Sequence, residues 1–356
     1  MKSRKLSAIN YIILSLGFLT LLWFAKENVA TKTETHIKHK GTLACFSENE
    51  KKGSNKTCEL SSAARFGEYI VTANDKVDDE ILLYKIDSLT QQTYQRKILP
   101  ALKIKLEPDY KVKKMESTSV FKDWIIMFGS YDRNVDPSFT KIIALKFKEQ
   151  TKKATDFHVV AGPELYDVFK KLISTTTPNG VDYFKIEASA IVPKPGDETQ
   201  AMLLLGVRED GKSYKDDEKQ ATTKIIGVSI TEKDGKVILG SDWKIIYNRE
   251  HTKDFGISSL EYNSEDKFLY VLLALEKNQA LSGKILRIRL PDLFNNKPLE
   301  SVDEVSFKNH KPEGLSYLGR NKFFIISDDD RKETSLPDAK RDMNEAVYWI
   351  ISQRNK

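Results

Sequence analysis

Lys185-Ile186-Glu187-Ala188-Ser189-Ala190 is the clearest copy of a pattern that recurs along the chain. In each copy an apolar residue or proline precedes Ser or Glu, a small residue follows, and strand-forming residues come next. The copies are Leu60-Ser61-Ser62, Met115-Glu116-Ser117, Ile186-Glu187-Ala188, Ile257-Ser258-Ser259 and Pro312-Glu313-Gly314. Their second positions are 55, 71, 71 and 55 residues apart. Strand-rich units of this length are typical of propeller blades. We therefore predict an all-β, five-bladed β-propeller. A six-bladed count stays open if a 71-residue unit contains an irregular blade.

The last unit is too short for a complete blade. Only 43 residues follow Glu313, fewer than the spacing of the other units. The apolar segment Thr42–Phe46 lies before the first unit and can supply the missing strand. Such a strand would close the ring and remove its open edges. A single helix is expected over Pro163–Ile173, which starts with Pro and has apolar residues three and four apart.

The composition describes a folded, soluble body with a basic N-terminus. Of the 356 residues, 40% are hydrophobic and 30% charged, as in ordinary globular proteins. The net charge is +6, and residues 1–40 contribute seven Lys or Arg and two Glu, hence most of the excess. The rest of the chain is nearly neutral with interleaved signs. Nucleic acid is therefore not an expected partner, since its recognition needs a basic stripe.

The N-terminal segment has the features of an export signal. Basic residues precede an apolar run from Leu6 to Ala25, and twenty helical residues span about 30 Å, the thickness of a bilayer core. The run fits an uncleaved membrane anchor or a cleaved signal peptide, and both place the following residues outside the cytoplasm. We expect an anchor or signal segment at 1–25, a polar tether at 26–41 and the propeller at 42–356. The body then faces the periplasm or cell exterior, or is secreted.

The two cysteines agree with export. Cys45 and Cys58 are separated by 13 positions and are the only cysteines in the chain. A disulfide between them would stabilise the fold by on the order of 3 kcal/mol. Two free buried thiols are the alternative.

The second position of the repeat predicts a metal site on the propeller axis. Innermost strands crowd the axis, so the five side chains are expected to face one another there. Carboxylates that share a site ionise together only if a cation neutralises them, and several hard oxygen ligands suit calcium. Capping residues around a water-filled channel are the alternative. The predicted calcium ligands are Ser61, Glu116, Glu187, Ser258 and Glu313.

Acidic and basic neighbours follow each second strand. In an antiparallel hairpin the end of the second strand returns to the face where the first began. These pairs are therefore expected on a rim beside the axial ring, where acids hold water and bases meet phosphate or carboxylate. Solvated loop charge is the alternative interpretation. The pairs are Asp75-Lys76, Asp132-Arg133, Arg208-Glu209, Glu276-Lys277 and Asp330-Arg331.

The order Ser, Glu, Glu, Ser, Glu resembles the calcium-activated nucleotidase (apyrase) family. The resemblance rests on Cys58-Glu59-Leu60-Ser61, Lys185–Ala190, Phe255–Ser259 and Lys311–Gly314, and so extends over most of the chain. It implies a five-bladed propeller with an axial calcium, in which rim acids activate water against a phosphoanhydride. Carried over, it assigns Asp75 to the acid and Arg208 to a phosphate-binding arginine. The chain is also similar to uncharacterised exported bacterial propellers, especially over Lys311–Asp330.

The sequence therefore predicts calcium-dependent hydrolysis of a phosphorylated small molecule, such as a nucleotide. Asp75 is the expected general base, and calcium would polarise the phosphate. Two alternatives stay open. One is a non-catalytic propeller that binds a ligand or protein partner over a structural calcium. The other is an esterase or lactonase on a calcium propeller, which would need a histidine near the metal, and His310 is the candidate. The expected phosphate-binding residues are Lys76, Arg133 and Arg208.

Overall fold

The computed structural model describes residues 33–47, 58–91, 98–133, 136–215, 217–249, 254–277, 280–302, 307, 309–328 and 345–355. The chain divides into two compact units, residues 1–34 with 354–356 and residues 35–353. The second unit is the body of the propeller. The segment at 1–25 and the first part of the predicted tether lie outside the described residues. Within the described part, no helix has the length and apolar character needed to span a membrane.

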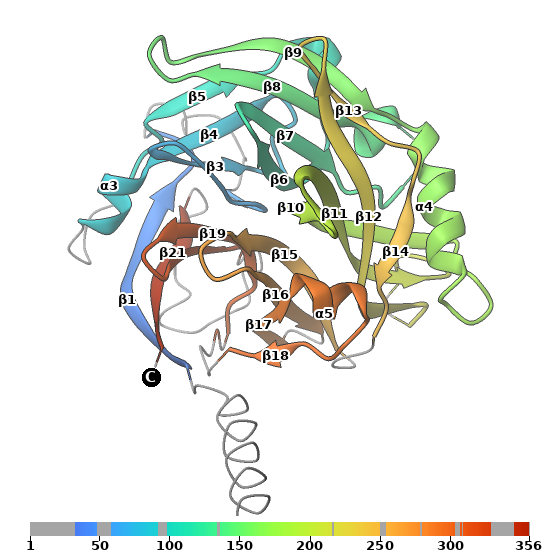
Figure 1. Cartoon of the computed structure of the whole chain (residues 1–356). Coiled ribbons are helices and arrows are strands. Elements are labelled where there is room, and N and C mark those ends of the chain that lie inside the picture. The colour runs from blue at the N-terminus through green and yellow to red at the C-terminus, as the bar shows by residue number, and fades with distance from the viewer. Residues whose placement is uncertain are drawn as a thin grey trace, which may run out of the picture. The chain divides into compact units, whose positions relative to one another are not determined.

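The described strands form five antiparallel sheets, as the repeat predicts, and Figure 1 shows them as five blades around a common axis. Blade one contains β2 (Ala64–Phe66), β3 (Tyr69–Ala73), β4 (Glu80–Lys85) and β5 (Leu102–Lys105). Blade two contains β6 (Met115–Phe121), β7 (Trp124–Gly129), β8 (Ile142–Lys148) and β9 (Lys153–Ala161). Blade three contains β10 (Tyr183–Lys194), β11 (Asp197–Gly211), β12 (Lys219–Lys233), β13 (Lys236–Leu239) and β14 (Lys244–Tyr247).

Blade four contains β15 (Phe255–Asn263), β16 (Phe268–Lys277), β17 (Ala280–Arg289) and β18 (Glu300–Ser301). Blade five contains β19 (Pro312–Gly319), β20 (Lys322–Ser327), β21 (Glu345–Asn355) and β1 (Thr33–Ala44). The sheet order β1-β21-β20-β19 confirms that an N-terminal strand completes the last blade. That strand begins nine residues earlier than the expected Thr42 and ends at Ala44. The polar first half of β1 was predicted as tether. An outer strand is held by backbone hydrogen bonds to its neighbour, so it can form without an apolar side-chain pattern.

The core lies between the blades. Within the described residues, five hydrophobic clusters fill the five interfaces between neighbouring blades, including the interface between blades five and one. Each blade is therefore buried on both faces. This explains why middle strands such as β16 read as continuous apolar runs rather than as alternating ones.

The connections add short helices to this ring. The predicted helix is confirmed as α4 (Glu164–Ser174), whose Leu165, Phe169 and Ile173 pack into the cluster between blades two and three. The shorter helical segments are α3 (Ile86–Thr90), α5 (Leu290–Phe294) and the 3-10 turns η1 (Pro108–Tyr110) and η2 (Pro137–Thr140).

The predicted disulfide is confirmed between Cys45 and Cys58. It joins the end of β1 to the segment that leads into blade one. Disulfides persist in oxidising compartments, so the bond agrees with an exported protein.

Candidate functional site

A β-bulge carries the ring residue in four of the five described inner strands. The register shifts between Met115 and Ser117, and the residue skipped is Glu116. The same shift occurs at Glu187, Ser258 and Glu313. In blade one, Ser61 directly follows the bridge between Leu60 and Asn74. A bulge leaves one residue unpaired and re-aims its side chain. This is how the repeat turns Ser or Glu toward the axis.

The small residue after each ring position lets neighbouring inner strands approach. A Cβ on Gly314 would lie 2.9 Å from the backbone nitrogen of Ala63 in blade one. Elsewhere small hydroxyls connect the blades, with 2.7 Å between Ser62 and Thr118 and 2.6 Å between Ser117 and Ser189.

The two ring serines also serve as connections between blades. The Ser61 hydroxyl donates to the carbonyl of Met115 in blade two. The Ser258 hydroxyl donates to the carbonyl of Pro312 in blade five, at 2.9 Å.

A buried group of ion pairs, here called the arginine cluster, contains the ring residues Glu187 and Glu313. Arg208 comes from β11, and its Nη1 contacts Glu187 and lies 3.2 Å from Oε1 of Glu313. Its Nη2 lies 3.4 Å from Glu276. The cluster consists of Lys185, Glu187, Arg208, Glu276, Lys311 and Glu313.

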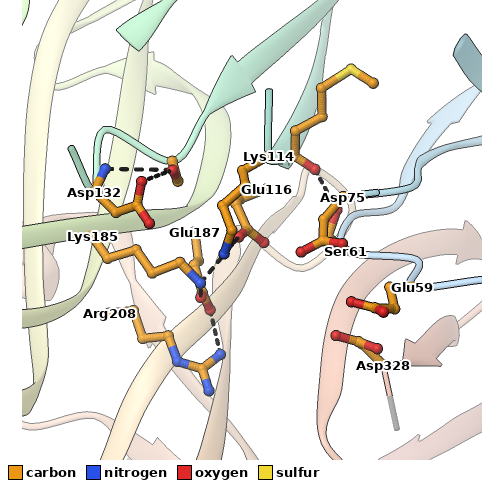
Figure 2. A network of polar contacts seen from close by, with 12 residues as sticks. Glu59, Ser61, Asp75, Lys114, Glu116, Asp132, Lys185, Glu187, Arg208 and Asp328 are labelled. Atoms are coloured by element: carbon orange, nitrogen blue, oxygen red, sulfur yellow. Dashed lines mark hydrogen bonds and ion pairs between the residues drawn. The ribbon is translucent and has the colours of Figure 1, made fainter. Parts of the chain in front are cut away.

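Two lysines complete the arginine cluster. Lys185 contacts Glu187, and its Nζ lies 3.0 Å from Oε1 of Glu116, so it links two ring carboxylates (Figure 2). Lys311 lies 3.1 Å from Glu313 and 3.0 Å from Asp328. Each of these carboxylates therefore faces at least one cation of the chain.

The charges of the arginine cluster are strongly coupled. Burial by itself would raise the pKa of Glu187, but Arg208 and Lys185 outweigh it and lower the pKa to about 2. Burial, together with Asp328 and Glu187, instead raises the pKa of Glu313 well above its usual range, against the opposing effect of Lys311 and Arg208. Burial would lower the pKa of Arg208, but the surrounding carboxylates raise it, so the guanidinium stays charged.

A second group, here called the aspartate cluster, lies beside blades one, two and five. The backbone nitrogen of Asp75 donates to the carbonyl of Glu59 at 2.9 Å, which fixes the loop after β3 against the start of blade one. Lys76 Nζ lies 2.5 Å from Glu59 and 3.2 Å from Asp75. In Figure 2 the carboxylates of Asp75 and Glu116 lie close together beside Ser61, and those of Glu59 and Asp328 point toward each other. The cluster consists of Glu59, Asp75, Lys76, Glu116 and Asp328.

Asp75 is the most perturbed carboxyl of the aspartate cluster. Its side chain is 9% exposed, and the Lys76 ammonium, 3.2 Å from its Oδ1, is the cation paired with it. Burial raises its pKa to about 8, with further contributions from the negative charges of Glu116 and Asp328. Lys76 opposes this shift without cancelling it. A buried carboxyl with such a pKa, close to cationic side chains, is a common feature of functional sites.

Accessible cationic side chains lie in the loops next to β3, β6 and β7. Lys76, Lys114 and Arg133 have side chains that are 44%, 29% and 47% exposed. Arg133 forms a two-pronged contact with Asp132, at 3.1 and 2.8 Å, and stacks over Phe139 at 4.8 Å. Lys114 lies 3.7 Å from Glu116. These heads can reach a ligand in solvent, whereas Arg208, at 4% exposed, cannot.

The side chains of the ring do not fit a calcium ion at its centre as they are arranged. Glu187 and Glu313 already face Arg208 and a lysine each. The Ser61 and Ser258 hydroxyls donate to backbone carbonyls of the next blade and keep their lone pairs, so the misfit lies in the glutamates. Calcium binds where several oxygen ligands converge without competing cations. Here guanidinium and ammonium groups supply the positive charge that the sequence analysis assigned to a metal.

The structure brings together only part of the predicted site. Asp75 and Lys76 lie beside Ser61 and Glu116, whereas the expected phosphate ligand Arg208 is buried among carboxylates. His310 is buried edge-on to Trp349, 5.0 Å between ring centroids, in the interface between blades four and five. The rim pair Asp330-Arg331 lies outside the described residues.

The sequence analysis did not predict four residues of these clusters and their borders as site residues: Glu59, Lys114, Lys185 and Lys311. A signal for the lysines was present, because each ring glutamate has Lys two residues before it: Lys114, Lys185 and Lys311. The ring serines do not, since Glu59 and Gly256 stand at that position.

Comparisons with known proteins extend only to the fold. No protein-family model matches the chain, and no curated protein matches its sequence. Among solved structures, the chain resembles the PQQ-bound aldose sugar dehydrogenase of Streptomyces coelicolor, at 7% identity over 91% of this chain and 99% of that one, with a TM-score of 0.46. It also resembles the GH43B protein of the Bacteroides ovatus xyloglucan locus, at 8% identity over 86% of this chain and 53% of that one, with a TM-score of 0.44. A third is the β-propeller domain of Myceliophteria thermophila Cps50 (Swd1), at 8% identity, 89% and 99% coverage and a TM-score of 0.34. These likenesses are too distant to carry an argument about activity.

Proposed function

We propose that this propeller is a hydrolase that acts on phosphorylated small molecules at the aspartate cluster. The observation that carries the proposal is Asp75, a buried carboxyl 3.2 Å from the half-exposed Lys76 ammonium, with a pKa that burial raises to about 8. A general base works best when its pKa is near the working pH, because it then combines the ionised form with a strong drive to accept a proton.

Asp75 would take a proton from a water molecule that attacks phosphorus. The new bond joins the water oxygen to phosphorus, and the bond from phosphorus to the leaving oxygen breaks. The leaving oxygen acquires a proton from solvent, so the products are an alcohol or shorter phosphate and inorganic phosphate. Lys76, Lys114 and Arg133 would hold the phosphoryl oxygens, since their heads are accessible and cationic. No step passes through a metal.

The test is phosphate release by the full-length chain from nucleoside di- and triphosphates and sugar phosphates, in calcium and in chelator. Asp75→Asn is the decisive variant, and Asp78→Asn is its matched control, because Asp78 lies on the same loop with a 39% exposed side chain. We expect release that Asp75→Asn abolishes and Asp78→Asn retains. The two conditions also test the calcium predicted from the sequence. Folded protein that releases no phosphate from any substrate would overturn the proposal.

A second candidate is a propeller that binds a phosphorylated ligand without turnover. The half-exposed heads of Lys76 and Arg133 favour it, because they could bind phosphate whether or not Asp75 activates a water molecule. Calorimetric titration with the same compounds separates the two functions. Binding without phosphate release supports the second one.

A further inference from the structure

The three glutamates of the axial ring each have a lysine two residues earlier in the same strand or at its entrance. The distances from Lys Nζ to the carboxylate are 3.7 Å for Lys114 and Glu116 and 3.1 Å for Lys311 and Glu313, and Lys185 contacts Glu187 directly. Each contact forms at a β-bulge, where the regular alternation of side chains is interrupted, and it recurs in all three blades that carry a ring glutamate. The pairing is therefore part of the repeat itself, and it occurs where the ring residue is Glu rather than Ser.

Arg208 connects these local pairs across the axis. It reaches from the second strand of blade three to Glu187 in its own blade, to Glu276 in blade four and to Glu313 in blade five. Its side chain is 4% exposed, as is that of Glu313. A buried charge is tolerated only when it is paired and hydrogen-bonded. The guanidinium thus has three carboxylate partners from three blades, which is the bridging role that a divalent cation would have in an all-oxygen ring.

We infer that this propeller closes its axis with its own cations, Arg208 and the lysines at the Lys-x-Glu positions, and that its fold does not depend on a divalent metal in the ring. Four cations, Lys114, Lys185, Arg208 and Lys311, lie 3.7 Å or less from one of the three ring glutamates, so each of these carboxylates already has a positive partner. A metal would have to displace an ammonium or guanidinium group from each carboxylate that it bound. A protein built in this way keeps its fold in a calcium-poor medium or in a chelator.

Thermal unfolding of the full-length chain tests this inference independently of any activity. In the unaltered protein, calcium and chelator should give melting temperatures within about 1 °C of each other, since a ligand that does not bind the native state does not stabilise it. Arg208→Met should lower the melting temperature in chelator by on the order of 5 °C, because breaking a buried pair leaves charges uncompensated. Calcium should then restore part of this loss in melting temperature, by binding the carboxylates that have lost the guanidinium, Glu187, Glu276 and Glu313.

Arg133→Met is the matched control. It removes the same group from the same face, but Arg133 is half-exposed and pairs with Asp132 alone. Its melting temperature should not respond to calcium. An Arg208→Met protein that is destabilised and that calcium does not rescue would contradict the inference that Arg208 stands where a metal would.

Calorimetric titration of the unaltered protein with calcium keeps the inference testable if Arg208→Met does not fold. Binding that Glu187→Gln abolishes would overturn it, because the metal would then occupy the ring. No binding, or binding that Glu187→Gln leaves unchanged, supports it, since the ion would then lie elsewhere. Failure of the hydrolase assay would leave this result untouched.

Discussion

The arginine cluster and the aspartate cluster meet at Glu116 and Asp328, which contact Lys185 and Lys311, but they differ in the protonation of their carboxyls. In the arginine cluster each carboxylate faces a buried cation, and the pKa of Glu187 is lowered to about 2. In the aspartate cluster the cations are half-exposed, and burial raises the pKa of Asp75 to about 8. Glu187 is therefore held ionised by buried cations, whereas Asp75 keeps its proton up to about pH 8 and lies beside the half-exposed head of Lys76.

This difference suggests a division of labour along one ring. Buried ion pairs contribute little net stability but are costly to break, so the arginine cluster connects blades three, four and five. A buried carboxyl with a raised pKa costs stability when it ionises, and such a cost is usual at functional sites. If the two clusters are separable, a substitution in one should leave the property of the other unchanged.

The largest expected effect is on turnover. Asp75→Asn should lower the rate of phosphate release by roughly 10²–10⁴-fold, the range for loss of a general base. Rate against pH in the unaltered protein should rise and reach a plateau above about pH 8, as Asp75 loses its proton. Steady-state assays between pH 6 and 9 measure both. A variant that keeps its rate would remove Asp75 from the mechanism.

The next effect is on stability. Glu187→Gln should destabilise the fold by about 3–5 kcal/mol, because Arg208 and Lys185 then lose their principal partner in a buried site. Urea unfolding measures the change. Glu232→Gln is the control, since Glu232 also faces two lysines, Lys122 and Lys146, but on a partly exposed surface. An equal loss in both variants would contradict the distinction between buried and exposed pairs.

A third prediction concerns pH and stability. The folded-state pKa of Asp75 is above the value of about 4 expected when unfolded, so the native state holds the proton more tightly. The stabilisation of the fold by protonated Asp75 is fully present below about pH 4 and is lost as the pH rises toward 8. Asp75→Asn lacks this loss, and its stability relative to the unaltered protein should increase between pH 5 and 8. Unfolding free energies at pH 5, 7 and 8 measure it, and a constant difference would rule the shift out.

The smallest effect is expected at the hydroxyl contacts between blades. Ser62→Ala should cost about 1 kcal/mol, since it removes one buried hydrogen bond to Thr118 and leaves that hydroxyl a weaker contact with Met127. It should not change the pH dependence of turnover. Thermal unfolding measures the cost, and a shift in the pH profile would show that the inner strands and the aspartate cluster are coupled.

Most of the fold was predictable from the sequence. The repeat around Glu116, Glu187 and Glu313 indicated five blades, and the short last unit indicated closure by an N-terminal strand. The start of that strand was wrong by nine residues, because the polar outer strand lacks the apolar pattern on which the prediction relied.

The site was predictable in its positions but not in its partners. The sequence by itself indicated the five repeated units, the closure of the last blade and the Cys45–Cys58 disulfide, because repeat spacing and chain closure are local or repeated properties of the chain. Only the tertiary structure decided which charged side chains form ion pairs with one another. Arg208 stands 105 positions from Glu313, yet they lie 3.2 Å apart because three blades bring their strand ends to one axis. The partners of long charged side chains depend on the tertiary structure. Burial raises the pKa of both Glu187 and Asp75, and the neighbouring charges decide that Glu187 becomes more acidic and Asp75 less acidic.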